Sequence, residues 1–582
     1  MPPEDGAGDG CVGVKVDVPG TTRDVSELAE LDLVHEHVSS AELDYSLGQL
    51  LPPTQLGGLS GAAGLLQAAV TQGQRIVVVG DFDADGATSC ALCLRALRVM
   101  GATDVHYLVP NRFEYGYGLT PEIVAVAARL QPDLVVTVDN GISSIAGVAA
   151  ARQLGMRVLV TDHHLPAEQL PEADAIVNPN LPGDTFPSKS LAGVGVAFYV
   201  MLALRARLRE QGWFAEQQLP EPNLAQFLDL VALGTVADVV PLDHNHRVLV
   251  QQGLQRMRAG HCVPGIRALL EASGRNLSSC VATDLGFAVG PRLNAAGRLD
   301  DMSVGIECLL TDDPAVAREM ATQLDALNRD RREIESDMQA QAMQAIAALD
   351  LDEDRLPVGL CLFDPDWHQG VIGILAARIK ENFHRPVVAF ARSSAGELKG
   401  SARSVPGLHI RDALDAVATR HPGLVGRFGG HAMAAGLTLA EDDYPAFAQA
   451  FDAEVARHLS RDDLSTVIYS DVELAESELS LDTAQLLRDA SPWGQAFPEP
   501  VFEGNFDVLS HYVVGQRHMK MMVRPLGGEH EIDAIAFNTP ELPEPCRQLH
   551  MAYRLDVNEY RGRISAQLII EYIGTPRLVA PA

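Results

Sequence analysis

The stretch that most constrains this chain is residues 75–100, RIVVVGDFDADGATSCALCLRALRVM. A short apolar run comes first, then three aspartates at alternate positions (Asp81, Asp83 and Asp85), then apolar residues at helical spacing. This order predicts a buried parallel strand, an acidic turn and a helix that packs back on the sheet. Aspartates this close repel one another, so the turn is unfavourable unless a cation lies among them. Because hard cations prefer carboxylate oxygen, the turn predicts a divalent metal site.

The same strand-then-helix pattern repeats after the acidic turn. Further runs rich in Val, Ile and Leu occur at residues 105–110, 133–141, 156–164 and 173–179, and helical patterns separate most of them. Apolar strands that alternate with helices are typical of a parallel sheet covered on both faces. The sequence therefore predicts an α/β fold for this part of the chain.

Metal-binding side chains recur where these predicted strands end. Asp139 ends the third strand in VDNG, and Asp162, His163 and His164 end the fourth in VTDHH. The carboxyl ends of parallel strands share one crevice, so these side chains are expected to converge with the acidic turn. A single aspartate at a strand end is usually a helix cap, but capping explains neither the tandem acids nor the paired histidines.

A site that mixes carboxylates with imidazole points to divalent metals, with Mn²⁺ favoured and Mg²⁺ as the alternative. More than four candidate ligands predict two ions. Two neighbouring metal ions suit an in-line displacement at phosphorus, which predicts hydrolysis of a phosphate ester or anhydride.

The chain has 582 residues, which is too long for a single hydrophobic core. Residues 311–350 carry a long polar helical pattern, which fits a connector between domains or one more helix of a bundle. The change in character beyond it favours the connector. We predict a flexible N-terminal tail, a parallel-sheet domain with a helical extension, the connecting helix, a second α/β domain and a small OB-like β-barrel, at residues 1–22, 23–310, 311–350, 351–460 and 461–582.

Composition limits the kinds of protein this chain can be. The net charge of −32 argues against a protein that coats DNA nonspecifically. No apolar run is long enough to span a membrane and the N-terminus does not resemble a signal peptide, so we expect a cytoplasmic protein without a membrane partner. Cys90 and Cys93 form a CxxC pair on the helix after the acidic turn, where packed thiols are expected rather than a redox or zinc site.

Several separate motifs resemble one enzyme superfamily. DFDADG, VDNG, VTDHH and GTVADVVPL resemble the four motifs of the DHH phosphoesterases, and GGHAMAAG at residues 429–436 resembles the signature of the DHH-associated domain. From about residue 25 onward, NRFEYGYG, GPRLNAAGRL and WHQGVIGI extend the resemblance to the superfamily's bacterial single-strand-specific 5′→3′ DNA exonucleases. The resemblance implies metal-dependent phosphodiester hydrolysis that releases 5′-mononucleotides, in DNA recombination and repair.

The resemblance also implies roles for individual residues. The expected metal ligands are Asp83, Asp85, Asp139, His163 and Asp238, and Asp139 would bridge both ions. His164 joins these residues as a catalytic contact to the phosphate or the transition state. Asp81 is expected either behind the ligands or as an outer ligand, and Asp162 is expected behind them, where it would orient a histidine. Asp229 has no counterpart in the motif and is interpreted as structural.

The expected DNA contacts are less specific. The residues that would bind nucleic-acid phosphate are Arg112, Arg292, His368, Ser401, Arg403, Gly430 and His431, with His368, Ser401 and Arg403 expected in loops. Tyr115, Tyr117 and Trp367 are candidates for base stacking, although core packing is expected for at least one of them. In the barrel, Arg517, His518, Lys520 and Arg524 are expected on two adjacent strands that form a single-strand groove.

The expected partner is single-stranded DNA with a 5′ end, and the resemblance adds a RecQ-type helicase and a single-strand-binding protein. We expect a monomer. Two other functions are kept open: a DHH enzyme for small substrates such as dinucleotides or pyrophosphate, and a catalytically inactive scaffold. The retained ligand set argues against the scaffold, and the C-terminal barrel argues against the small-substrate enzyme.

Overall fold

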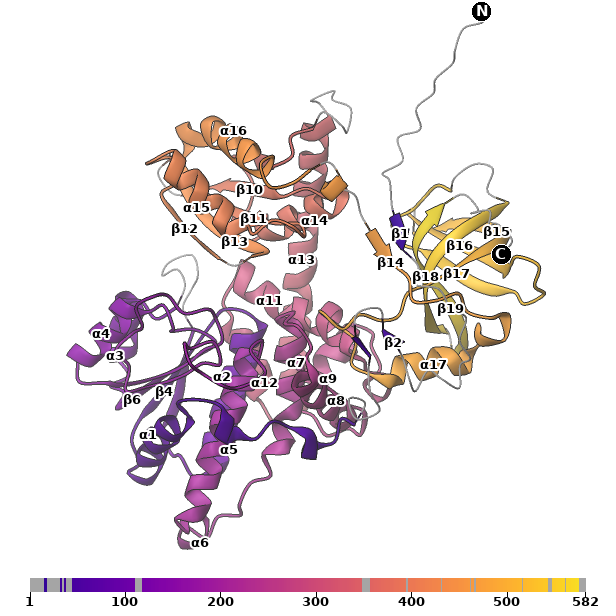
Figure 1. Ribbon diagram of the computed structural model, residues 1–582. Coiled ribbons are helices and arrows are strands. Elements are labelled where there is room, and N and C mark those ends of the chain that lie inside the picture. The colour runs from indigo at the N-terminus through magenta and orange to yellow at the C-terminus, as the bar shows by residue number, and fades with distance from the viewer. Residues whose placement is uncertain are drawn as a thin grey trace, which may run out of the picture. The chain divides into compact units, whose positions relative to one another are not determined.

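The computed structural model describes the chain over the following residues: 15–17, 32–33, 36–37, 44–109, 118–347, 356–393, 396–430, 432–460, 462–464, 467–515, 517–542, 547–560 and 562–574. The chain divides into two compact units. One contains Arg329–Tyr469, and the other contains Pro19–Asn328 together with Ser470–Ala582. Figure 1 labels the elements of both units.

The larger unit is built on a five-stranded parallel sheet, which confirms the predicted fold class. The strand order is β5-β4-β6-β7-β8. These strands are β4 (Ile76–Gly80), β5 (Val105–Leu108), β6 (Leu134–Val138), β7 (Arg157–Thr161) and β8 (Ala175–Val177). Central strands β4 and β6 are buried throughout, as expected for a sheet covered on both faces.

Two layers of helices cover this sheet (Figure 1). Alternate strand residues such as Val78 and Val136 share a core with one layer, and Val77 and Val135 share a core with the other. The first layer consists of α1 (Leu59–Thr71), α2 (Ala84–Val99) and α5 (Gly193–Glu210). The second layer consists of α3 (Pro121–Ala128) and α4 (Ile145–Gln153).

Cys90 and Cys93 lie on α2 inside the first layer, as free, buried thiols. Burial raises the pKa of Cys93 to about 12, and it raises the pKa of Cys90 well above its usual value. The interpretation of this CxxC pair as packed thiols is confirmed.

A mostly helical extension follows the sheet and packs against α2 and α5. It contains α6 (Trp213–Glu216), α7 (Leu228–Ala237), α8 (His244–Arg258), α9 (Pro264–Ala272), α10 (Ala282–Asp284), the π-helical turn η7 (Leu285–Val289), α11 (Gly290–Leu299) and α12 (Ser303–Leu310). Most of α7 is buried around its whole circumference, which explains its continuous apolar sequence. Among the described residues, no helix is both long and apolar enough to cross a bilayer.

Helix α13 (Pro314–Ala347) runs from the larger unit into the smaller one. Its C-terminal half buries Met338, Ala342 and Ile346 against the smaller unit's own core. Trp367 belongs to this core and donates its indole N–H to Gln341 Oε1 at 2.8 Å. Of the three candidate stacking aromatics, Trp367 is therefore a packing residue.

The smaller unit contains a mixed five-stranded sheet of order β12-β13-β11-β10-β9. Its strands are β9 (Leu360–Phe363), β10 (Val387–Arg392), β11 (Glu397–Arg403), β12 (Arg427–Gly430) and β13 (Ala434–Ala440). Its helices are α14 (Ile372–Phe383), α15 (Ile410–Arg420) and α16 (Tyr444–Val455). Our placement of Ser401 and Arg403 in a loop was wrong, because both lie on β11, which pairs with β10 and β13.

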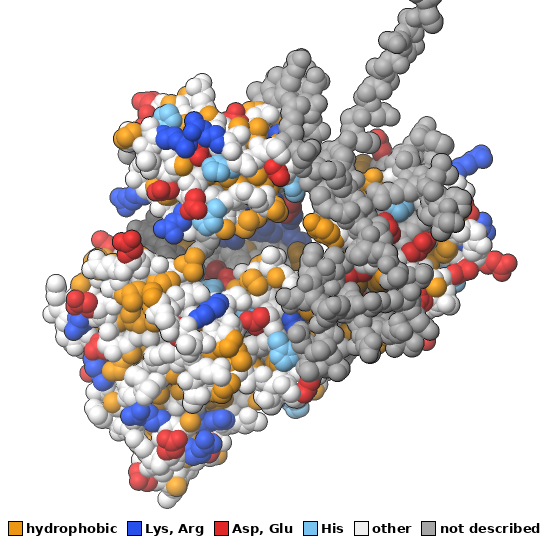
Figure 2. Space-filling view, in the orientation of Figure 1, with side chains coloured by type: hydrophobic (Ala, Val, Ile, Leu, Met, Phe, Trp, Pro, Cys, Tyr) orange, Lys and Arg blue, Asp and Glu red, His pale blue; other side chains and the backbone are white. Residues whose placement is uncertain are grey.

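The surface of the smaller unit carries visible positive charge. Figure 2 shows Lys and Arg side chains, in blue, gathered on the face of this unit that the view presents. Asp and Glu side chains lie among them on the same face. On this face of the smaller unit, basic and acidic side chains are therefore interspersed.

The C-terminal strands form the predicted barrel, closed in the order β15-β16-β17-β19-β18. They are β15 (Phe502–Val514), β16 (His518–Pro525), β17 (Ile532–Ala536), β18 (Gln548–Tyr560) and β19 (Arg563–Gly574), preceded by α17 (Leu481–Ala490).

The basic residues of this barrel lie differently from our expectation. His518, Lys520 and Arg524 all lie on β16 and Arg517 precedes it, so they do not occupy two strands. Lys520 approaches Asp533 at 3.6 Å and Arg524 approaches Asp507 at 3.4 Å. These acidic partners reduce the net positive charge of the strand.

Within the larger unit, the segment that leads into the barrel packs on the helical extension. Leu242 shares a small apolar cluster with Trp493 and Phe497, and its backbone N–H donates to Gln495 O at 2.8 Å. The guanidinium carbon of Arg247 lies 4.0 Å from the centre of the Phe497 ring. Because Leu242 is close in sequence to Asp238, this contact anchors the loop that carries a predicted metal ligand.

Candidate metal centre

The acidic turn joins β4 to α2 and is held by backbone hydrogen bonds. Asp83 caps α2 and accepts from Gly86 N at 3.0 Å, so it serves as a helix cap in addition to any other role. Asp85, in the first helical turn, is almost completely buried. Its two carboxylate oxygens accept from Gly193 N at 2.7 Å and Val194 N at 2.8 Å, which begin α5. The amino end of α5 thus holds Asp85 toward the end of the sheet.

Asp139 follows β6 in a left-handed backbone conformation, with φ of 61°. Aspartate tolerates this region better than most residues do. Its N–H donates to Thr161 O on the neighbouring strand at 3.1 Å. The close approach of α5 depends on a glycine, because a Cβ at Gly193 would lie 2.6 Å from Asp139 Oδ1.

The DHH triplet at the end of β7 is organised by Asp162. This buried carboxylate accepts from Ile142 N at 2.8 Å and from His163 N at 2.7 Å. It also lies 2.7 Å from His164 Nδ1. Asp162 therefore orients the His164 ring and keeps the turn rigid.

Residues separated by more than a hundred positions in the sequence converge here. His163 Nε2 lies 3.1 Å from Asp139 Oδ1 and 3.5 Å from Asp238 Oδ2. Asp238 sits at the C-terminal end of α7. Three groups have ligand atoms within 4.8 Å of one another: Asp139–His163–His164, Asp85–His163–Asp238 and Asp81–Asp83–Asp139. We call these seven residues the acidic cluster.

The electrostatics of the acidic cluster are unfavourable for a metal-free site. Burial, followed by the charge of Asp83, raises the pKa of Asp85 to about 7. Burial and the neighbouring aspartates raise the pKa of Asp139 and of Asp238 well above the usual range. Although burial opposes it, the bond to Asp162 raises the pKa of His164. Buried carboxylates with one or two imidazoles form a donor set that fits hard or borderline divalent cations.

Asp229, the other deep carboxylate of this region, lies outside the acidic cluster. It accepts from Leu230 N at 2.9 Å and from Val263 N at 2.7 Å. Both partners are backbone amides, which agrees with the structural interpretation.

The residues expected to contact DNA are distributed between the two units. In the larger unit, Arg292 on α11 pairs with Asp325 at 2.7 Å and donates to Ala288 O at 2.7 Å. This arginine already has intramolecular partners. Arg112, Tyr115, Tyr117 and His431 lie outside the described residues.

In the smaller unit, Ser401 and Arg403 meet the first turn of α14. Arg403 Nη1 donates to Ser401 Oγ at 3.1 Å. A Cβ at Gly373, in the first turn of α14, would lie 2.9 Å from Arg403 Nη2 and 3.0 Å from Ser401 Oγ. His368 Nδ1 accepts from Gly370 N at 3.1 Å in the loop before this helix. Gly430 ends β12 with φ of 145°, where a Cβ would lie 2.4 Å from Ala434 O.

Three residues that support the acidic cluster were missed by our interpretation of the sequence. Besides Gly193, Asn294 Oδ1 accepts from Ala84 N at 2.8 Å, and a Cβ at Gly297 would lie 1.8 Å from Phe82 O. Asn294 and Gly297 belong to GPRLNAAGRL, so this motif directly supports the acidic turn. The signal was present in this motif and in the glycines of LAGVGVA, but neither pattern indicates which turn it contacts.

Replacing Gly193 with alanine is expected to lower the metal affinity and the catalytic rate at least about tenfold, because the methyl group would push Asp139 out of place. Isothermal titration with Mn²⁺ and an assay of phosphate-ester hydrolysis measure the two effects. Gly212→Ala provides a matched control, since nothing lies within 4 Å of a Cβ at Gly212, although its φ of 75° adds backbone strain. Equal metal affinity in the Gly193 variant and the unsubstituted chain would contradict the prediction.

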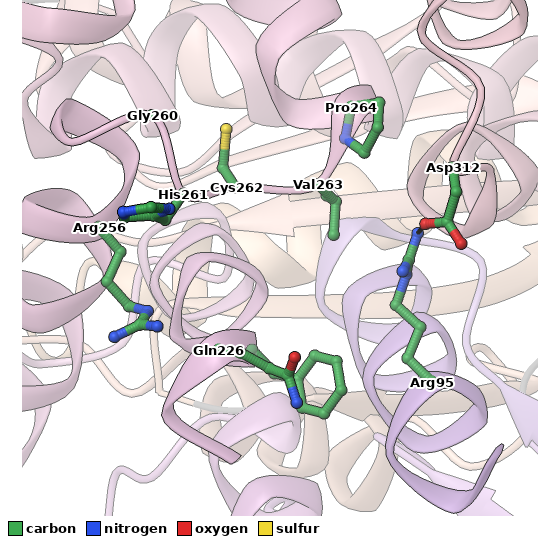
Figure 3. A pocket seen from close by; sticks show the side chains of 10 residues that line it. Arg95, Gln226, Arg256, Gly260, His261, Cys262, Val263, Pro264 and Asp312 are labelled. Atoms are coloured by element: carbon green, nitrogen blue, oxygen red, sulfur yellow. Dashed lines mark hydrogen bonds and ion pairs between the residues drawn. The ribbon is translucent and has the colours of Figure 1, made fainter. Parts of the chain in front are cut away.

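A cleft of about 450 Å³ lies elsewhere in the larger unit (Figure 3). It is lined by Arg95, Gln226, Phe227, Arg256, Gly260, His261, Cys262, Val263, Pro264 and Asp312, and none of these belongs to the acidic cluster. Arg95 donates to Leu309 O and Leu310 O and pairs with Asp312, so it closes the end of α12. This cleft is therefore separate from the acidic cluster.

Three domain families match this chain. The DHH family, N-terminal domain, matches residues 75–235; the DHHA1 domain matches residues 356–457; and the RecJ OB domain matches residues 470–572. Together they account for the parallel sheet, the mixed sheet and the barrel.

Named relatives match over nearly the whole chain. The single-stranded-DNA-specific exonuclease RecJ of Dickeya dadantii (strain 3937) is 60% identical, and the alignment covers 91% of this chain and 93% of that protein. The protein of the same name from Escherichia coli (strain K12) is 56% identical over 92% and 93%. The crystal structure of RecJ in complex with Mn²⁺ from Thermus thermophilus matches with a TM-score of 0.78 and 32% identity, covering 97% of this chain and 80% of that one.

Proposed function

Because this chain belongs to the RecJ family of single-stranded-DNA-specific exonucleases, we propose that it hydrolyses single-stranded DNA from the 5′ end. The products are 5′-mononucleotides, and the process served is DNA recombination and repair. The observation that carries this proposal is the convergence of Asp83, Asp139, His163 and Asp238 within one acidic cluster. A crowded carboxylate site of this kind suits metal-dependent hydrolysis at phosphorus.

The metal ligands we propose are Asp83, Asp85, Asp139, His163 and Asp238, with Mn²⁺ favoured and Mg²⁺ as an alternative. Structures of the Thermus thermophilus relative are described in complex with each of these two ions. Divalent ions held by these five residues would lower the pKa of water and offset negative charge at the phosphate.

The chain's own residues prepare this site. The amino end of α5 holds Asp85, and Asp162 fixes the His164 ring. Because the pKa of His164 is raised, its imidazole is suited to donate a hydrogen bond to a phosphate oxygen. Asp81 stays close to Asp83 and Asp139, where it supports the ligands.

The smaller unit is proposed to hold the DNA backbone. Arg403 and Ser401 lie together at the first turn of α14, and a helix amino end favours anions. His368, Gly430 and His431 complete the phosphate contacts proposed for this unit, and Arg112 and Arg292 those proposed for the larger one.

The decisive experiment incubates the full chain and Mn²⁺ with 5′-phosphorylated single-stranded DNA, the matching duplex, and a dinucleotide at equal concentration. We expect 5′-mononucleotides from the single strand, little cleavage of the duplex and slow cleavage of the dinucleotide. Faster cleavage of the dinucleotide would instead favour an enzyme for small substrates. No cleavage of any substrate in the presence of measured metal binding would favour a scaffold.

Replacing Arg403 with alanine is expected to raise KM for long single strands about tenfold or more and to leave kcat within a few-fold, because Arg403 is proposed to bind phosphate and is not one of the proposed metal ligands. The dependence of log KM on log salt should become shallower by about 0.7 to 1. Arg411→Ala, which removes an exposed arginine on α15 of the same unit, is the matched control. An unchanged salt dependence would count against a phosphate contact at Arg403.

The remaining proposals concern the setting of the enzyme. A RecQ-type helicase and a single-strand-binding protein are proposed partners, because an enzyme restricted to single strands needs duplex to be opened and the product strand to be presented. A monomer in the cytoplasm is proposed as the working form, which sedimentation of the purified chain and cell fractionation would test.

A further inference from the structure

An aromatic side chain stands exposed on the turn that precedes α11. Phe287 lies in the π-helical turn η7, and 76% of its surface is accessible to solvent. Its neighbours Leu285, Ala288 and Val289 are buried in the core. A short π-helical turn inside a helical region is uncommon and occurs frequently at functional sites. A single exposed apolar residue is ordinary on a protein surface. The informative feature of Phe287 is where it lies in the fold.

One side of this turn packs against the end of α7, next to the proposed metal ligand Asp238. A Cβ at Gly286 would lie 3.3 Å from Val236 Cγ1, and a Cβ at Gly290 would lie 3.0 Å from Ala237 Cβ. Both glycines therefore allow the turn to pack tightly on the last turn of α7, and Asp238 follows Ala237 directly. Phe287 is thus fixed beside the C-terminal end of α7.

The residue after Asp238 adds a second exposed apolar side chain. Val239 has a φ of 59°, which a β-branched residue rarely adopts, and 63% of its surface is accessible. Two anchored residues flank this position: Asp238 Oδ2 lies 3.5 Å from His163 Nε2, and Leu242 N donates to Gln495 O.

The other side of the turn leads to the acidic turn itself. Asn294 lies on α11, the helix that directly follows the turn carrying Phe287. Asn294 Oδ1 accepts from Ala84 N, directly after Asp83. The turn that carries Phe287 therefore lies next to two elements that reach the acidic cluster, the end of α7 and α11.

We propose that Phe287 stacks on a base of the single-stranded substrate beside the metal centre and thereby positions the nucleotide for cleavage. The inference rests on the proposed nuclease function. An aromatic face accepts any base, which suits an enzyme that must degrade a strand of any sequence. Stacking also requires a base that has left its duplex partner, so Phe287 contributes to the preference for single strands.

The test compares two 5′-phosphorylated single strands, one with normal bases and one with abasic sugars at its first five positions. Phe287→Ala is expected to raise KM for the normal strand about 5- to 150-fold, the range for loss of one stacking contact. It should leave KM for the abasic strand within about twofold of the unsubstituted value. The KM for the abasic strand divided by the KM for the normal strand should therefore decrease in Phe287→Ala, and Phe287→Trp should restore this ratio.

Two controls separate this inference from a structural effect and from the function it rests on. Leu154→Ala removes an exposed side chain at the end of α4, 59% accessible, and should leave both KM values unchanged. The melting temperature and Mn²⁺ affinity of Phe287→Ala should match those of the unsubstituted chain. A Phe287→Ala variant that keeps the unsubstituted ratio overturns the inference alone. An unsubstituted chain that cleaves neither strand overturns the proposed nuclease function, and the inference with it.

Discussion

Replacing Asp139 with asparagine is expected to reduce cleavage of single-stranded DNA about a thousandfold or more while the chain remains folded. The loss corresponds to about 4 kcal/mol of transition-state stabilisation. Asp139 belongs to two of the three ligand groups, one with Asp81 and Asp83 and one with His163 and His164. Its Oδ1 lies 3.1 Å from His163 Nε2, so it connects the acidic turn with the DHH triplet. Asparagine is chosen because it also tolerates the left-handed backbone at this position, with φ of 61°.

The same substitution should stabilise the metal-free chain at pH 8. The pKa of Asp139 is raised well above the usual range, first by burial and then by neighbouring aspartates, so its charged form opposes folding when no cation is bound. A neutral amide removes that repulsion. Thermal melting in EDTA measures this effect, and a nuclease assay with Mn²⁺ measures the loss of activity.

Asp229→Ala supplies the matched control, because Asp229 is equally buried but lies outside the acidic cluster. Its carboxylate accepts from two backbone amides, so its loss should destabilise the chain by about 1–3 kcal/mol. Metal binding and cleavage measured well below the melting temperature should persist. Equal losses of activity in the two variants would contradict a special role for Asp139.

Mn²⁺ is expected to stabilise the chain much more at pH 8 than at pH 5.5. The pKa of Asp85 is raised to about 7 by burial and by Asp83, and burial and neighbouring aspartates also raise those of Asp139 and Asp238 well above the usual range. In the unfolded chain an aspartate has a pKa of about 3.9. Between the unfolded pKa of about 3.9 and the raised pKa values of the folded chain, the folded chain binds more protons than the unfolded one. The stability of the metal-free chain therefore falls as the pH rises through this range.

Metal binding requires deprotonated carboxylates, so its contribution grows over the same pH range. A concentration of about 100 times Kd adds about 2.7 kcal/mol at pH 8, and protonation of the cluster weakens binding at pH 5.5. Melting curves at both pH values, with Mn²⁺ and with EDTA, measure the difference. Asp139→Asn should reduce the pH dependence, and an equal Mn²⁺ shift at both pH values would show that the ion binds elsewhere.

Much of the fold was predictable because it depends on local patterns. The apolar runs that became β4 and β6 are buried on both faces, and such strands have an unmistakable composition. The errors arose where local pattern and tertiary pairing disagree. Lys399 to Arg403 resemble a basic loop, yet they form β11 because partners on both sides supply their backbone hydrogen bonds.

The residues of the acidic cluster and of its supports also divide into those that a local sequence pattern indicates and those that it does not. Asp81, Asp83, Asp139 and the DHH triplet were placed correctly at strand ends, because parallel strands present their carboxyl ends at one edge. Asp238 is at the end of a helix, and only the resemblance to the DHH phosphoesterases identified it. Gly193 and Asn294 carry no metal-binding group, so their support of Asp139 and Ala84 is visible only in the folded chain.

The sequence by itself determined the α/β class, the acidic turn, the DHH triplet and the C-terminal barrel, since each arises from hydrophobic periodicity or from side-chain chemistry within a short window. Tertiary structure alone decided that α5 holds Asp85 and that α11 supports the acidic turn. It alone decided that Phe287 is exposed beside Asp238. These contacts join residues far apart in the chain, and their distances depend on how helices pack, which no local pattern records.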